Sequence, residues 1–200
     1  MIDVSVIIPA YNANLYLARA IRSVIANRSQ YKFEVIVVDD GSTDDTKNTM
    51  ATFGKLIKSS FINKNVGLPT ALNTGIRISS GRYIVRVDAD DFVNENYIQI
   101  LALFLDLNTE FDAVRCDYLR VSEDESVLGK FSQTQHPIGC AIMFRRRVLE
   151  ALNGYDPNSL VNEDVELYKR FQQAGYRMGE INIPLYRYRD TPNSLSKENI

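Results

Sequence analysis

Long apolar segments and clustered cysteines are both missing from this sequence of 200 residues. No stretch of about eighteen residues is continuously apolar, which excludes a membrane-spanning helix. The amino terminus has neither the basic nor the apolar segment of a secretory signal. The two cysteines, Cys116 and Cys140, are not spaced like metal ligands, which predicts free thiols in a reducing compartment. We therefore expect a soluble, cytoplasmic protein.

The sequence also lacks an excess of positive charge and any repeated or low-complexity tract. It contains 23 Lys and Arg against 25 Asp and Glu, for a net charge of −2. Non-specific binding of nucleic acid requires a basic surface, so a nucleic-acid partner is disfavoured. The 45% hydrophobic content, with 10 Gly and 6 Pro, is that of one ordinary globular domain. Residues 1–200 are therefore expected to form a single domain.

Short apolar runs alternate with helical patterns along the chain. Nearly continuous apolar strands are typical of a parallel sheet that is covered on both faces. The strands are expected at residues 4–9, 33–38, 56–63, 83–87, 138–144 and 186–189. The helices are expected after Asn14 and at residues 46–53, 69–79, 94–107 and 165–174. This alternation predicts an α/β fold with a mostly parallel central sheet flanked by helices.

Acidic side chains directly follow two of these strands. Asp39 and Asp40 end one strand, and Asp88, Asp90 and Asp91 follow another. Parallel strands deliver such residues to the edge of the sheet where ligands bind. Asp88 and Asp90 are two positions apart in an extended chain, so their carboxylates point the same way and favour a divalent cation or another ligand between them. The alternative, that Asp90 and Asp91 only cap the next helix, stays open at this point.

Two phosphate-binding patterns are absent. No Gly-x-Gly-x-x-Gly follows the first predicted strand, and the chain contains no Gly-Lys-Ser/Thr. These absences count against a dinucleotide-binding Rossmann site and against a phosphate-binding loop. A nucleotide at this edge would then need a metal ion to neutralise its phosphates.

Five short motifs follow one another in the order of a known family. They are Pro9-Ala10-Tyr11-Asn12, Val38-Asp39-Asp40-Gly41-Ser42-Thr43-Asp44, Asn65-Val66-Gly67 with Ala71, Asn73 and Gly75, Asp88-Ala89-Asp90-Asp91, and Glu163-Asp164. In order and spacing this set resembles the inverting glycosyltransferases of family 2, which have the GT-A fold. The resemblance spans roughly residues 2–190.

This resemblance implies a nucleotide-binding half at residues 1–92. Tyr11 and Pro9 would line the base pocket, Asp40 would accept a hydrogen bond from the base, and Asp88 would contact the ribose or the donor sugar. Asp90 would bind a divalent cation, Mn2+ or Mg2+, that bridges the diphosphate. The full set implied for the donor is Pro9, Tyr11, Asn12, Asp40, Asn65, Gly67, Asp88 and Ala89.

An acceptor-facing half is implied at residues 93–200. Asp164 would be the catalytic base, and Gly139, Cys140 and Glu163 would lie on the acceptor side. The residue chemistry agrees, because an acceptor hydroxyl needs a base within hydrogen-bond reach. The start of a helix favours the ionised, proton-accepting form of Asp164. Acids that merely occupy the first turn of a helix are the alternative.

The resemblance implies transfer of a sugar from a nucleoside diphosphate donor, most simply a UDP-sugar, to a hydroxyl of a glycan or glycolipid. It also implies a place in cell-surface polysaccharide or glycolipid synthesis, with association at the inner face of the membrane through parts not in this chain. A nucleotidyltransferase of the same sheet class is one alternative, although it would need a Gly-rich, basic loop after the first strand. A non-catalytic module that binds nucleotide sugars or glycans is the other.

Some positions depart from the family or remain ambiguous. Arg189 stands where many relatives have a His that completes the metal site, which leaves the third metal ligand open. The run Arg145-Arg146-Arg147 is either a phosphate-binding patch or an ordinary helix start, and the lone His136 is expected to be structural. Asn193-Ser194-Leu195-Ser196 resembles the segment that follows Arg189 in relatives. Those relatives often continue beyond it, so we expect the sequence to be the catalytic core of a longer protein.

Overall fold

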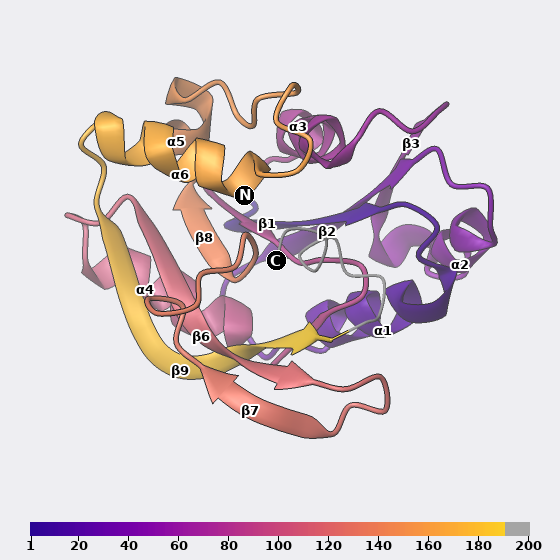
Figure 1. The fold of residues 1–200 in the computed structure, drawn as a ribbon, viewed down its shortest axis with the longest axis horizontal. Helices are drawn as coiled ribbons and strands as arrows, with labels where there is room; N and C mark the ends of the chain where they lie inside the picture. Colours follow the sequence, from indigo (N-terminus) through magenta and orange to yellow (C-terminus); the bar gives the residue numbers. More distant parts are fainter. Residues whose placement is uncertain (191–200) are drawn as a thin grey trace.

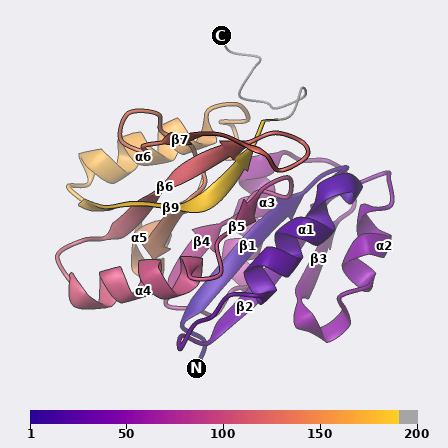
Figure 2. The ribbon, with the colours of Figure 1, turned by 90° about the horizontal axis from the view of Figure 1, so that it is seen from below.

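A computed structural model describes residues 1–190, and within them nine strands form one sheet with helices on both faces (Figures 1 and 2). The strands are β1 (Val4–Ala10), β2 (Phe33–Asp40), β3 (Lys58–Ile62), β4 (Tyr83–Arg86), β5 (Phe92–Val93), β6 (Ala113–Val121), β7 (Val127–Phe131), β8 (Ile142–Arg145) and β9 (Met178–Arg189). The helices are α1 (Asn14–Ile25), α2 (Thr46–Ala51), α3 (Leu68–Ile78), α4 (Tyr97–Leu107), α5 (Arg146–Ala151) and α6 (Glu163–Gln173), with a 3-10 turn η1 (Gly54–Leu56). The segment Asn193-Ser194-Leu195-Ser196 lies outside the described residues.

The sheet has two parts that differ in strand direction. β3, β2, β1 and β4 lie side by side in that order and run parallel, as the sequence predicts. The order continues with β8, β6, β9 and β5, where β8 and β5 run antiparallel to their neighbours, and β7 pairs with β6. A short hairpin joins β6 to β7, and such a hairpin connects only antiparallel strands. Because β1, β2 and β4 run parallel, their carboxyl ends lie at one edge of the sheet. The long strand β9 curves along β6 in the other part of the sheet (Figure 1).

The core consists of two apolar layers, one on each face of the sheet. Along β1, Val4, Val6 and Ile8 pack in the layer that contains α1 and α4, whereas Ile7 packs in the layer of α3, α5 and α6. Successive side chains of a strand point to opposite faces, so a strand covered on both sides has to be continuously apolar. Leu17 and Ile21 are fully buried on the inner face of α1. Within residues 1–190, no helix combines the length and the apolarity that crossing a bilayer requires.

Several element bounds differ from those expected. Helix α2 ends at Ala51, and η1 continues the turn. The strand expected at 138–144 begins only at Ile142, because the Gln133 side-chain amide binds the backbone in its place. Gln133 Nε2 donates to the Ile138 and Cys140 carbonyls, and Gln133 Oε1 accepts the Ile138 N–H. Side-chain bonds of this kind satisfy the backbone without a strand partner.

Candidate active site

Two loops at the carboxyl edge of the sheet are fastened to each other. The Asn12 N–H donates to Ser42 Oγ at 2.8 Å, and the Thr43 N–H donates to Asn12 Oδ1 at 2.9 Å. Asn12 has a φ of 48°, a conformation that Asn adopts more readily than most residues. Asn12 thus holds the loops together, whereas the neighbouring Tyr11 is 49% exposed and presents its ring at the edge. Pro9 is buried within β1, behind this surface.

The adjacent acids at the end of β2 have different surroundings, because they point to opposite faces of the sheet. Asp40, which the sequence assigned to the base, uses both carboxylate oxygens to accept the N–H groups of Val66 (3.0 Å) and Gly67 (2.8 Å). Asp39 Oδ2 is buried and has no hydrogen-bond partner among the described residues; Lys47 Nζ lies 3.7 Å away, too far for one. An unpaired buried acceptor is costly. Among the described residues, a buried carboxylate oxygen without a hydrogen-bond donor thus belongs to Asp39, and sequence reasoning assigned it no separate role.

Two glycines with positive φ place the loop before α3, and each is closely approached by another segment. Gly41 has a φ of 74°, and a Cβ on it would lie 2.6 Å from the Asn65 nitrogen. Gly67 has a φ of 94°, and a Cβ there would lie 2.7 Å from Leu160 Cδ2. Asn65 itself is exposed at the edge of the sheet. The loop before α6, which contains Leu160, thus meets the loop that the sequence assigned to the donor.

Asp91 anchors the turn that follows β4. It is 2% exposed, and its carboxylate accepts the Tyr186 hydroxyl at 2.8 Å and the Arg189 N–H at 2.7 Å. Burial, followed by the negative charges nearby, raises the pKa of Asp91 well above its usual range. Helix α4 begins only at Tyr97 and has no side-chain cap. The alternative that Asp90 and Asp91 cap this helix is therefore wrong.

Asp88 and Asp90 keep partial exposure on the same turn. The Arg86 guanidinium donates to both oxygens of Asp88, with a distance of 3.0 Å from Arg86 Nη2 to Asp88 Oδ2. Burial and then the charge of Asp88 raise the pKa of Asp90 to about 6. A pKa raised by a neighbouring like charge indicates that a cation would be stabilised there. Ala89, between the two acids, is 8% exposed and packs inward.

The oxygen ligands of this turn fit a divalent cation of the Mg2+ or Mn2+ type at Asp90. Ligand atoms of Asp88, Asp91 and Cys140 also lie within 4.8 Å of one another. Asp91 is held by two hydrogen bonds, however, and burial raises the pKa of the Cys140 thiol well above its usual range, which disfavours the thiolate that a metal needs. Cys140 is 1% exposed with Sγ 3.9 Å from Asp91 Oδ2, so its side chain lies beneath the turn, and the assignment of its loop to the acceptor side stays a prediction.

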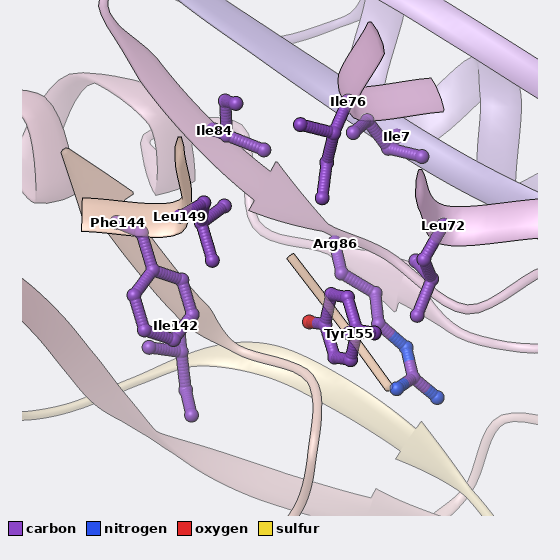
Figure 3. A pocket seen from close by; sticks show the side chains of 9 residues that line it. All are labelled: Ile7, Leu72, Ile76, Ile84, Arg86, Ile142, Phe144, Leu149 and Tyr155. Carbon is purple, nitrogen blue, oxygen red and sulfur yellow. The ribbon is translucent and has the colours of Figure 1, made fainter. Parts of the chain in front are cut away.

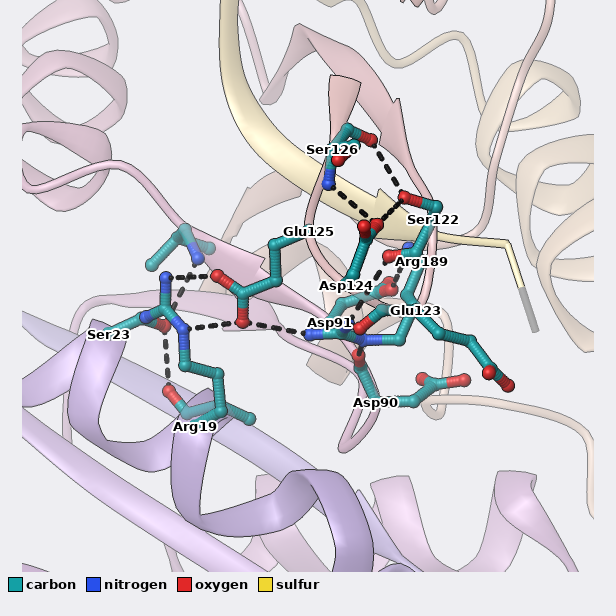
Figure 4. A network of polar contacts seen from close by, with 12 residues as sticks. Arg19, Ser23, Asp90, Asp91, Ser122, Glu123, Asp124, Glu125, Ser126 and Arg189 are labelled. Atoms are coloured by element: carbon teal, nitrogen blue, oxygen red, sulfur yellow. Dashed lines mark hydrogen bonds and ion pairs between the residues drawn. The ribbon is translucent and has the colours of Figure 1, made fainter. Parts of the chain in front are cut away.

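Arg189 fastens the hairpin between β6 and β7 to this turn (Figure 4). Its side chain donates to the carbonyls of Asp90 (2.9 Å) and Glu123 (2.6 Å), and it forms an ion pair with Glu125 at 3.2 Å. Glu125 also binds Arg19 of α1 at 2.9 Å. With a side chain only 3% exposed, Arg189 is a structural anchor rather than a substitute metal ligand.

Asp164 and Glu163 begin α6 and point in different directions. A Cβ on Gly139 would lie 2.8 Å from Asp164 Oδ2, so the Gly139 loop runs directly beside this carboxylate. Asp164 is partly exposed, and its Oδ1 accepts the Val165 N–H at 2.8 Å. Glu163 is 6% exposed and accepts the Arg86 Nη1 hydrogen bond at 2.8 Å. Glu163 therefore directs its carboxylate to the protein interior, and its assignment to the acceptor side stays a prediction.

The three consecutive arginines all have structural partners. Arg145 donates to the Leu105 carbonyl at 2.6 Å, near the end of α4. Arg146 donates to the Gly81 carbonyl at 2.6 Å, and Arg147 forms an ion pair with Asp112 at 2.8 Å. The run is therefore the start of α5, not a phosphate-binding patch. His136 lies edge-on to the Phe131 ring, with centroids 5.5 Å apart, as a structural residue would.

Comparison with known sequences gives a family for the chain. The family model described as "Glycosyl transferase family 2" matches residues 5–165. An uncharacterized glycosyltransferase of Haemophilus influenzae is 40% identical over 114 residues, which cover 56% of this chain and 35% of that protein. The putative teichuronic acid biosynthesis glycosyltransferase TuaG of Bacillus subtilis is 27% identical, covering 96% of this chain and 81% of the relative. The chain thus spans about a third of the length of the first relative.

Solved structures share the fold. S. aureus TarS 1–349 in complex with UDP-GlcNAc superposes with a TM-score of 0.80 at 20% identity, covering all of this chain and 62% of that one. The mannosyltransferase PcManGT from Pyrobaculum calidifontis, in complex with GDP-Man and Mn2+, gives 0.74 at 20% identity, covering 98% of this chain and 59% of that one. This likeness shows the GT-A fold. Since the family model covers most of the chain, the protein belongs to glycosyl transferase family 2.

Proposed function

We propose that this chain transfers a sugar, with inversion, from a uridine diphosphate sugar to a hydroxyl group of a glycan or glycolipid. The observation that carries the proposal is the position of Asp164, a partly exposed carboxylate that lies against Gly139. Its neighbour Glu163 is tied through Arg86 to Asp88 on the opposite side. The first turn of α6, which carries the proposed base, is thereby tied to the turn after β4, which carries the proposed donor-binding acid.

The donor nucleotide would occupy the edge formed by the ends of β1 and β2. Tyr11 offers an exposed aromatic face for the base, and Asp39 Oδ2 offers an acceptor for a base N–H. Asn65 is exposed beside them, whereas Asp40 and Asn12 hold the loops in place. The complexes of TarS with UDP and with UDP-GlcNAc support a uridine donor by analogy of fold.

Asp90 would hold the divalent cation, Mn2+ or Mg2+, with the donor phosphates supplying further oxygens. Such a cation, when bound, stabilises the negative charge that develops on the leaving diphosphate. The protein's own contribution is a fixed turn: Asp91 anchors it from below, and Arg189 holds the Asp90 carbonyl at 2.9 Å. In Figure 4 the Asp90 side chain extends away from the Arg189 guanidinium. Mn2+ in the PcManGT complex supports this by analogy.

Asp164 would accept the proton of the attacking hydroxyl. Asp164 lies in the first turn of α6, where its Oδ1 accepts the Val165 N–H at 2.8 Å, and this bond orients the carboxylate. Direct attack by an acceptor oxygen, with one base and no covalent intermediate on the protein, inverts the anomeric carbon once. The name of TuaG supports a role in cell-surface polysaccharide synthesis. The buried free thiols, Cys116 and Cys140, accord with a cytoplasmic location, and association with the inner membrane face stays a prediction.

Calorimetric titration with UDP, GDP and TDP, each with and without Mn2+, tests the donor site. We expect the tightest binding for UDP with Mn2+, and a lack of nucleotide binding would refute the proposal. A screen of UDP-sugars for release of UDP then tests catalysis. Binding without any turnover, even with glycan acceptors present, would favour the non-catalytic module. Release of pyrophosphate from a nucleoside triphosphate and a sugar phosphate would favour the nucleotidyltransferase.

A further inference from the structure

Arg86 joins two carboxylates that belong to different sides of the site. It is the last residue of β4, and its side chain is 11% exposed. Arg86 Nε and Nη2 donate to the two oxygens of Asp88, and Nη1 donates to Glu163 Oε1 at 2.8 Å. Asp88 lies on the turn that carries Asp90, and Glu163 immediately precedes Asp164. One rigid guanidinium therefore contacts both the predicted donor turn and the start of the helix that carries the predicted base.

The surroundings of Arg86 leave it little freedom to move. Its stem lines a small cavity whose other walls are apolar and include Ile7, Leu72, Ile84 and Tyr155 (Figure 3). An arginine stem packs well against apolar surface while its charged head reaches a polar partner. A buried charge is tolerated only when it is paired. The two carboxylates pair the buried guanidinium, and the guanidinium in return fixes the orientation of both carboxylates.

We propose that Arg86 is a positioning residue that sets the separation between Asp88 and the first turn of α6, and thereby the position of Asp164 relative to the donor. By binding both oxygens of Asp88, Arg86 also leaves Asp90 as the carboxylate that binds the cation. This inference rests on the proposed function. The planar fork of arginine makes it possible, since five N–H groups in fixed directions can hold two carboxylates at once.

A simpler role for Arg86 would be to neutralise charge, and lysine separates the two roles. Arg86→Lys keeps the positive charge, but a single ammonium group cannot reproduce the three bonds of the fork. Arg86→Met removes the charge as well. Glu163→Leu removes only the contact between Arg86 and the start of α6. Arg146→Lys is a matched control, because Arg146 also makes side-chain bonds, to the Gly81 carbonyl and to Ser79 Oγ, in a structural setting.

Binding of Mn2+ alone, measured by electron paramagnetic resonance, tests the contact between Arg86 and Asp88. If Arg86 withholds Asp88 from the cation, both Arg86→Lys and Arg86→Met should bind Mn2+ about ten-fold more tightly, because the freed Asp88 carboxylate adds a second charged oxygen ligand. A merely structural loss would weaken Mn2+ binding or leave it unchanged. Arg146→Lys should bind Mn2+ as the wild type does.

Hydrolysis of UDP-GlcNAc without an acceptor, with UDP affinity measured on the same samples, tests the contact between Arg86 and Glu163. We expect Glu163→Leu to lower kcat at least about ten-fold with little change in UDP affinity. The double variant Arg86→Met/Glu163→Leu should lose no more kcat than the worse single variant, because both substitutions break the same contact between Arg86 and Glu163. If Arg86→Lys keeps both the wild-type kcat and the wild-type Mn2+ affinity, this inference is overturned, but the proposed function is not. A wild-type protein that fails to bind UDP with Mn2+ would overturn both the inference and the proposed function.

Discussion

Replacement of Asp164 by asparagine tests the proposed base with little change of shape. Asp164 Oδ1 accepts the Val165 N–H at 2.8 Å, and the asparagine carbonyl oxygen can take over that bond. The amide NH2 group then replaces Oδ2, the oxygen that faces Gly139. The helix start loses one negative charge, which costs about 0.3–1 kcal/mol of stability. The fold should therefore survive, and the main loss is the proton acceptor.

The expected loss of activity is large by comparison. A general base contributes about 10²- to 10⁴-fold to the rate, which corresponds to about 2.7–5.4 kcal/mol in the activation free energy. Single-turnover transfer from UDP-sugar to whichever acceptor a screen supplies measures this step, and calorimetry with UDP and Mn2+ measures donor binding on the same preparation. We expect Asp164→Asn to lose transfer by at least about a hundred-fold while UDP affinity is retained.

Glu163→Gln is the matched control for this experiment. A glutamine oxygen can still accept the bond that Arg86 Nη1 makes at 2.8 Å, so this variant should lose much less activity. Transfer near the wild-type rate in Asp164→Asn would refute the assignment of the base. Joint loss of UDP binding and turnover would instead place Asp164 in the donor site.

Four further variants test other parts of the chain. Asp90→Ala should abolish the Mn2+-dependent part of UDP binding in calorimetry while thermal unfolding shows the fold intact; unchanged affinity would remove Asp90 as the ligand. Tyr11→Ala should weaken UDP binding by about 1–3 kcal/mol through lost stacking, and Asp39→Asn should weaken UDP more than GDP; equal effects on both nucleotides would argue against a contact with the base. Burial alone would raise the pKa of Asp106, but hydrogen bonds from Arg82 and two tyrosines outweigh it and lower the pKa from 3.8 to about 2. Because the folded pKa lies below the unfolded one, this stabilisation is present above the unfolded pKa and is lost as the pH falls through about 2. Urea unfolding should therefore show Asp106→Asn destabilised by about 1 kcal/mol at neutral pH, since solvent screens this partly exposed group, and by little near the folded pKa; an equal destabilisation at both would contradict the reasoning.

The sequence by itself predicted the elements that repeat a local pattern. The strand at residues 33–38 and the helix after Asn14 appear as β2 and α1, because apolar periodicity reports burial directly. The order of the five motifs also sufficed to identify the family, which the family model confirms over residues 5–165. The antiparallel part of the sheet was not predicted. Strand direction in that part depends on which strands meet after long connections, and periodicity carries no information about that pairing.

Only the tertiary structure decided which acid does what. In the sequence, Asp39 and Asp40 are equivalent neighbours, but the backbone N–H groups of Val66 and Gly67 bind Asp40, whereas Asp39 Oδ2 has no hydrogen-bond partner among the described residues. The sequence likewise cannot show that Glu163 turns inward while Asp164 stays at the surface. The inward position of Glu163 accords with Arg86, the last residue of β4, which donates to Glu163 at the start of α6. The sequence predicts the chemical types of the site residues. Their roles depend on hydrogen-bond partners that are distant in sequence and close only in the fold.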